Sequence, residues 1–200
     1  DSLIIHAGGI LADLSNTTLL QDFRKIDKAQ RALFSTLSEA VRRYPGDPQV
    51  WERLGDAQMH WGWGPGLAIT PRQIAESFDH AIALDSAVTP AYIHATSLAF
   101  RRSTAEGRQY AEALLAQHAT GPVADGMRLA YRLADTALLS SAARQRVIDS
   151  APANQLGPAL EALYNWNDRA ETGIALQRAF ERSVLLPSAR TVPEDRKTLP

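Results

Sequence analysis

A spaced pattern of one aromatic and two smaller side chains recurs along this chain and limits the folds available to it. Trp51, Leu54 and Gly55 follow Pro45 in the order P-x5-W-x2-L-G. The unit begins again 41 residues later, with other residues in the equivalent places: Ser86, Tyr92, Ala95 and Thr96. This separation is a 34-residue period plus seven residues, and a glycine-rich insertion at 60–71 contains the excess. A recurrence of this length indicates stacked units of supersecondary structure.

Between the two occurrences the apolar residues have the spacing of an amphipathic helix. Four of them make one apolar face: Ile74, Phe78, Ala81 and Ile82. Thr70 is a favourable N-cap residue, and Pro71 suits the first helical position. We therefore expect a helix over about 71–84.

Weaker signatures extend the pattern in both directions. Leu37 and Ala40 lie as far before Trp51 as Phe78 and Ala81 lie before Tyr92. The segment 29–44 is therefore predicted to be the second helix of an earlier unit. Further helices are predicted over 104–118, 123–138 and 140–150, followed by a hairpin of 158–166 and 169–184. We expect 1–28 to form an N-terminal helical cap, 29–186 the repeat array and 187–200 a frayed tail.

These positions resemble the tetratricopeptide repeat family, in which an aromatic residue, leucine and glycine lie on the first helix of each pair. The resemblance implies an all-α fold, a tetratricopeptide-like helical-hairpin solenoid of about eight to ten helices. It covers 29–100 best, and Gln58 and Ser86 depart from the family pattern. The runs 51–55, 78–86 and 90–94, together with the inserted glycine-rich loop, also resemble repeat segments attached to bacterial serine/threonine kinases, which implies a sensor or docking role. The chain has none of the kinase motifs.

Composition excludes several classes of protein. The net charge is −1 with both signs interspersed, so no basic stripe predicts nucleic-acid binding. There is no cysteine, which excludes disulfides and thiolate chemistry. The apolar run at 3–14 is too short for a membrane span, which needs roughly 20 residues. The compartment stays open between a bacterial cytoplasm and periplasm.

The insertion is the most unusual stretch, with two tryptophans and three glycines within 61–67. As a recognition loop, its contact residues would be His60, Trp61, Trp63, Pro65 and Leu67. The alternative, which we favour, is that both tryptophans pack on the adjacent helices while the glycines permit sharp turns. No strand precedes the glycines, so a phosphate-binding loop is not predicted.

The resemblance also implies a concave groove lined by the first helices of the units. Its lining would be Gln49, Glu52, Arg53, Asp56, Ile93, His94, Ser97, Arg128 and Tyr131. In this groove Arg53 and Arg128 would be available for peptide carboxylates. The alternative is an ordinary solvated helical face, because no dense basic clamp is present.

No arrangement of residues predicts catalysis, a metal site or a cofactor. His80 and His94 lie on consecutive predicted helices and could meet, but no histidine pair has the spacing of a zinc hydrolase. We therefore expect a non-catalytic module that binds a protein or peptide partner. The alternatives are a structural subunit of a larger, membrane-associated assembly, or a small-molecule sensor.

Overall fold

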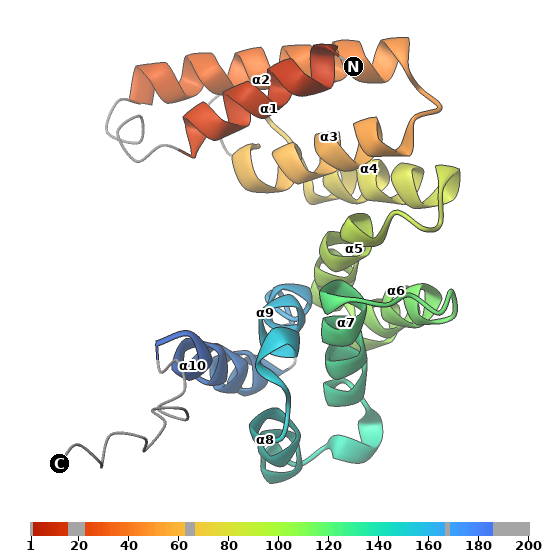
Figure 1. Ribbon diagram of the computed structural model, residues 1–200, viewed down its shortest axis with the longest axis vertical. Helices are drawn as coiled ribbons and strands as arrows, with labels where there is room; N and C mark the ends of the chain where they lie inside the picture. The colour runs from red at the N-terminus through yellow and green to blue at the C-terminus, as the bar shows by residue number, and fades with distance from the viewer. Residues whose placement is uncertain (1, 16–22, 63–66, 167–168, 186–200) are drawn as a thin grey trace, which may run out of the picture.

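The computed structural model describes residues 2–15, 23–62, 67–166 and 169–185. Within these ranges every regular element is a helix, so the expected all-α class is confirmed (Figure 1). In chain order the elements are α1 (Ser2–Leu14), α2 (Phe23–Arg43), α3 (Pro48–Trp61), α4 (Pro71–Leu84), α5 (Thr89–Arg102), α6 (Thr104–Leu115), α7 (Pro122–Leu133), the 3-10 helix η2 (Thr136–Leu138), α8 (Ser141–Asp149), α9 (Ala153–Ala162) and α10 (Ala170–Leu185). None of the helices described is both long and apolar enough to cross a membrane. The predicted tail at 187–200 lies outside the described residues.

Local chemistry explains where the central helices begin. The Asp47 carboxylate caps α3 by accepting a hydrogen bond from the Gln49 backbone N–H at 2.9 Å. Thr70 and Gln73 form a capping box at the start of α4, where Pro71 occupies the first turn. Helix α4 therefore has the bounds that periodicity and capping predicted.

The first six helices form three sequential pairs, α1 with α2, α3 with α4, and α5 with α6. Adjacent pairs contact through α2 and α3 and through α4 and α5. Figure 1 shows α1 to α4 stacked at one end of the molecule and α5 leading into the C-terminal helices. Close approach within a pair depends on small residues: a Cβ atom on Gly55 of α3 would lie 2.7 Å from Cε1 of Phe78 in α4. Residues 28 and 29, where the cap was expected to end, both lie inside α2.

The C-terminal half departs from the predicted helix order. The helix expected over 123–138 ends at Leu133, and its principal partner is α9, which follows η2 and α8. The helix expected to begin at Pro158 begins at Ala153, and Pro158 lies inside it. A Cβ atom on Gly126 of α7 would lie 2.4 Å from Cβ of Pro158. The proline is thus part of a helix contact rather than a helix start.

Helix α5 is the centre of the molecule. Every residue from 91 to 100 is buried, because α3, α4, α6, α7 and α9 all contact this helix. Its buried residues divide between two cores: Tyr92 and Phe100 belong to the large C-terminal core, whereas Ala91 and Ala95 pack in the same core as Phe78 of α4. This central position brings residues of α5 next to segments more than 60 positions away in the sequence.

A hydrogen bond between side chains links the second and third helix pairs. The Tyr110 hydroxyl of α6 donates to Asp79 Oδ1 of α4 at 2.6 Å. Burial, together with this hydrogen bond and the charge of Asp79, raises the pKa of Tyr110 to about 12. Since the unperturbed value is 10.0, the folded state favours the neutral phenol. The corresponding stability is fully present below pH 10 and is lost as the pH rises through 12.

Replacing Tyr110 with phenylalanine is expected to lower the free energy of unfolding by about 1 kcal/mol at pH 7, because one hydrogen bond to a carboxylate is lost. The measurement is urea unfolding, combined with ultraviolet titration of phenolate formation. Wild type minus Tyr110→Phe should show one tyrosine ionising near pH 12. Tyr164→Phe is the control, because Tyr164 is 77% exposed and its loss should not change stability. A difference titration with its midpoint at pH 10 would contradict the assignment.

Candidate functional site: a cleft beside a histidine and carboxylate cluster

A large cavity lies between two groups of helices among the described residues. It has a volume of about 780 Å³, and α3, α4 and α5 form one wall while α9 and α10 form the other. Figure 1 shows α3 and α4 on one side of α5, and α9 and α10 on the other. Its apolar lining consists mainly of Met59, Ile74, Leu98, Leu160, Tyr164 and Phe180. Its polar lining consists of His60, His94, Arg101, Glu161, Asn165 and Gln177.

Two histidines and one aspartate meet at the wall of this cleft. Asp56 and His60 are four residues apart on α3 and therefore lie on one face of the helix. Asp56 Oδ1 is 3.3 Å from Nε2 of His94 on α5 and 3.5 Å from Nε2 of His60. The two imidazole rings lie edge to face, with their centroids 5.2 Å apart. The three side chains can each offer one metal-ligand atom, and these atoms all lie within 4.8 Å of one another.

His94 is held in an unusual polar environment. The residue is 7% exposed, and within the described residues its buried Nδ1 atom has no hydrogen-bond partner. The carboxylate oxygen Oε1 of Glu161, on α9, lies 3.5 Å from this nitrogen. That distance is too long for a well-formed hydrogen bond. A buried nitrogen without a partner is costly, so this atom requires an explanation.

The two acidic residues of α3 have pKa values shifted in opposite directions. Burial raises the pKa of Glu52, although Arg53 Nε lies 3.6 Å from its carboxylate. Burial also acts to raise the pKa of Asp56, but the hydrogen bond with His94 and the nearby positive charges outweigh it. The pKa of Asp56 therefore lies below its ordinary value. Asp56 is thus a carboxylate at neutral pH.

The structure does not assemble the predicted groove as an open face. Glu52 of α3 is buried, and Ile93, His94 and Ser97 of α5 are buried where α5 contacts α9 and other helices. Asn165 Nδ2, just beyond α9, donates to Ser97 Oγ at 3.0 Å. The alternative of an ordinary solvated face is therefore wrong at these four positions. The physical reason is that the C-terminal helices fold back onto α5.

The remaining predicted groove residues belong to two helices, α3 and α7. Gln49 and Arg53 are exposed on α3. Arg128 of α7 is occupied locally, with Nη1 2.8 Å from Asp125 Oδ1 and Nη2 donating to the Ala119 carbonyl at 2.7 Å. Tyr131 is half-buried beneath the Arg108 guanidinium, at 4.3 Å from the ring centroid. Of the groove residues, only Asp56 and His94 contribute to the cluster, and they are joined there by His60 from the predicted loop.

The insertion is described only at its two ends. Trp61 is half-buried and packs against the N-terminal core of Ala7, Leu14, Ile26, Leu33, Leu37 and Ala57. This contact agrees with the packing alternative for Trp61. Leu67 is half-buried, whereas Trp63 and Pro65 lie outside the described residues.

His80 and His94, which could have met on consecutive helices, have different neighbours. His80 stacks on Trp51, with ring centroids 4.3 Å apart and an interplanar angle of 24°. His94 instead contacts α3, one helix earlier than expected. The signal that could have identified the cluster was the Asp56 and His60 pair at i, i+4 on the helix preceding the one that carries His80.

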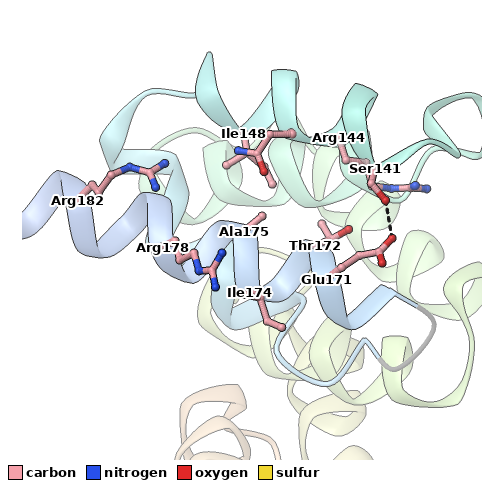
Figure 2. A pocket seen from close by; sticks show the side chains of 10 residues that line it. Ser141, Arg144, Ile148, Glu171, Thr172, Ile174, Ala175, Arg178 and Arg182 are labelled. Atoms are coloured by element: carbon pink, nitrogen blue, oxygen red, sulfur yellow. Dashed lines mark hydrogen bonds between the residues drawn. The ribbon is translucent and has the colours of Figure 1, made fainter.

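A second cavity of about 470 Å³ lies between α8 and α10. Figure 2 shows Ser141 of α8 donating a hydrogen bond to Glu171 of α10, at 2.7 Å. The buried Arg144 donates to the carbonyls of Leu133 and Leu139, which ties α8 to the end of α7. Ser141, Glu171 and Arg144 of this pocket are therefore engaged in contacts between helices. We therefore take the larger cleft as the candidate site.

Comparisons with protein-family models, with curated proteins and with solved structures found no match for this chain. The fold and the site accordingly define an all-helical protein with a large cleft between two groups of helices. Its function has to be argued from that cleft and from the polar cluster in its wall.

Proposed function

We propose that this chain is a non-catalytic binding module of the tetratricopeptide-like kind, and that its cleft holds a short segment of a protein or peptide. Three sequential helix pairs that stack through neighbouring members support the repeat architecture. The close contact of Gly55 with Phe78 supports it further, since small residues permit such an approach within a pair. A docking or sensor segment of a bacterial signalling protein is the setting that this architecture favours.

The observation that carries this proposal is the size and lining of the cleft. Its volume of about 780 Å³ lies within the range of roughly 300–1,000 Å³ that is typical of ligand sites. Apolar side chains from both walls can receive apolar side chains of a partner, while Asn165 and Gln177 can hydrogen-bond to its backbone. A lining surface that is mostly apolar, with polar side chains placed along it, is the composition expected of a specific binding site.

Tyr164 is the most informative residue at the edge of this cleft. It follows α9 and is 77% exposed, although tyrosine is a large and partly apolar residue. Tyrosine is enriched among the residues that dominate protein interfaces, because it contributes a rigid contact area and a hydroxyl group. We therefore assign it the role of the principal anchor for a bound segment.

Replacing Tyr164 with alanine is expected to weaken binding of a partner peptide about tenfold, which corresponds to about 1.4 kcal/mol. The peptide is first selected from a random display library on the full chain, and its affinity is then measured by fluorescence anisotropy. Ile5→Ala is the matched control, since Ile5 is 74% exposed on α1, far from the cleft in sequence. Equal affinities for the two variants, or a library that yields no binder, would contradict the proposal.

A further inference from the structure

We propose that Asp56, His60 and His94 bind a single divalent transition-metal ion, Zn²⁺ being the best fit, in the wall of the cleft. The ion would join α3 to the central helix α5. This inference goes beyond the binding of a protein segment and does not depend on it.

The chemistry of the three side chains suits such an ion. Imidazole nitrogen and carboxylate oxygen are ordinary ligands of Zn²⁺, and two histidines with one carboxylate is a recurrent ligand set of transition metals. Mg²⁺ and Ca²⁺ instead prefer sites made of oxygen ligands, which this cluster does not provide. The donor set therefore selects for a transition metal.

The distances between the side chains agree with shared coordination. Zn²⁺ binds nitrogen and oxygen at about 2.0–2.2 Å in tetrahedral geometry, so two of its ligand atoms lie about 3.3–3.5 Å apart. Asp56 Oδ1 lies 3.3 Å from His94 Nε2 and 3.5 Å from His60 Nε2. Both histidines thus approach the same carboxylate oxygen at the separation that a common ion would require. The whole set of ligand atoms lies within 4.8 Å, which small side-chain rotations can close.

The buried Nδ1 atom of His94 is the second, independent observation. A histidine that binds a metal through Nε2 is neutral and carries its proton on Nδ1. That N–H group would face Glu161 Oε1, which already lies 3.5 Å away. Histidine ligands of metals usually donate this second N–H to a carboxylate, which fixes the ring orientation and its tautomer. Metal binding at Nε2 would place the proton on Nδ1 and direct it at Glu161, so that a small movement of either side chain gives this buried nitrogen a partner.

The charge around the cluster also favours a cation. His94 lies between two carboxylates, with Nε2 3.3 Å from Asp56 Oδ1 of α3 and Nδ1 3.5 Å from Glu161 Oε1 of α9. A divalent ion would compensate these carboxylates at the point where they converge.

Three protein ligands leave one position of a tetrahedral ion open. His60 and His94 both line the cleft, so this position would face the space that a bound segment occupies. A water molecule, or an oxygen or nitrogen atom of the bound segment, would complete the coordination. The ion would then act both as a clamp between helices and as a contact for the ligand.

The test uses the full chain without a histidine tag, stripped of metal by a chelator and titrated with Zn²⁺ in a calorimeter. We expect one Zn²⁺ per chain and a rise in Tm on binding. His60→Ala is the main variant, because His60 is exposed and its loss should leave the fold intact. We expect it to weaken Zn²⁺ binding by at least about 100-fold, and Glu161→Gln to weaken it about tenfold.

His80→Ala is the matched control, because His80 is also an exposed histidine but stacks on Trp51 outside the cluster. It should bind Zn²⁺ as the wild type does. Wild-type protein that takes up no Zn²⁺, or equal affinities for His60→Ala and His80→Ala, would overturn the inference. No peptide is present in this titration, so its outcome is separate from that of the Tyr164 experiment.

Discussion

Replacing Phe78 with alanine is expected to lower the free energy of unfolding by about 3–5 kcal/mol, the range for buried phenylalanines. Its ring is fully buried between α3, α4 and α5. Several residues around it are small: Gly55 lies against the ring, and Ala81, Ala91 and Ala95 belong to the same core, together with the larger Leu98. Because glycine and alanine have no side-chain torsion that could fill the space, most of the cavity should persist. The cost should therefore lie in the upper part of that range.

This loss is measured by urea unfolding followed by circular dichroism. Phe34→Ala is the control, since Phe34 is a half-buried phenylalanine at the edge of the N-terminal core. Phe34→Ala should lower the free energy of unfolding clearly less than Phe78→Ala does, because folding removes less apolar surface of Phe34 from water. If the two variants lost equal stability, the close packing of Phe78 against Gly55 would not have the importance that we give it.

Replacing Gly126 with alanine is expected to lower the free energy of unfolding by about 2 kcal/mol. The new Cβ atom would lie 2.4 Å from Cβ of Pro158, 2.8 Å from the Ala159 backbone nitrogen and 2.9 Å from the Pro158 carbonyl carbon. A proline ring and backbone atoms cannot rotate aside, so α7 and α9 would have to separate. Overpacking of this kind costs about 1–3 kcal/mol. It should exceed the helix-propensity gain of up to about 1 kcal/mol that alanine has over glycine.

Gly173→Ala is the matched control for this prediction. Gly173 lies inside α10, and a Cβ atom added there meets no other atom within 4 Å. The same substitution should therefore raise the free energy of unfolding by about 0.5–1 kcal/mol, because only the helix propensity changes. A loss of stability for Gly126→Ala together with a gain for Gly173→Ala would support the close contact of α7 with α9. A higher free energy of unfolding for both variants would show that α7 and α9 are not packed this closely.

The helices that could be predicted best were those with strong local signals. Helix α4 has the predicted bounds, because Thr70 and Pro71 determine its start and its apolar residues have helical spacing. Ser140 caps α8, as serine at a helix start is expected to do, by accepting a hydrogen bond from the Ala143 N–H at 3.2 Å. Each of these signals acts between residues a few positions apart. They can therefore be recognised without knowledge of the rest of the fold.

The predictions that failed concern which helix covers which face. The side of α5 that carries His94 and Ser97 was expected to be open, but both residues are buried where α5 contacts α9 and other helices. Pro158 was expected to start a helix, but it lies inside one and packs against Gly126. A proline is compatible with either position, and only the contact with α7 distinguishes them.

The candidate site shows the same division between local and distant information. Helical spacing is sufficient to place Asp56 and His60 on one face of α3, because that relation depends only on the geometry of a single helix. It cannot show that His94 turns toward that face while His80 stacks on Trp51. Nor can it show that Glu161, more than 60 residues further along, lies beside His94. Local sequence was therefore enough for the helical class and for the starts of helices such as α4 and α8. The cleft and its polar cluster depend on how the helices pack, because their residues come from segments that only the folded chain brings together.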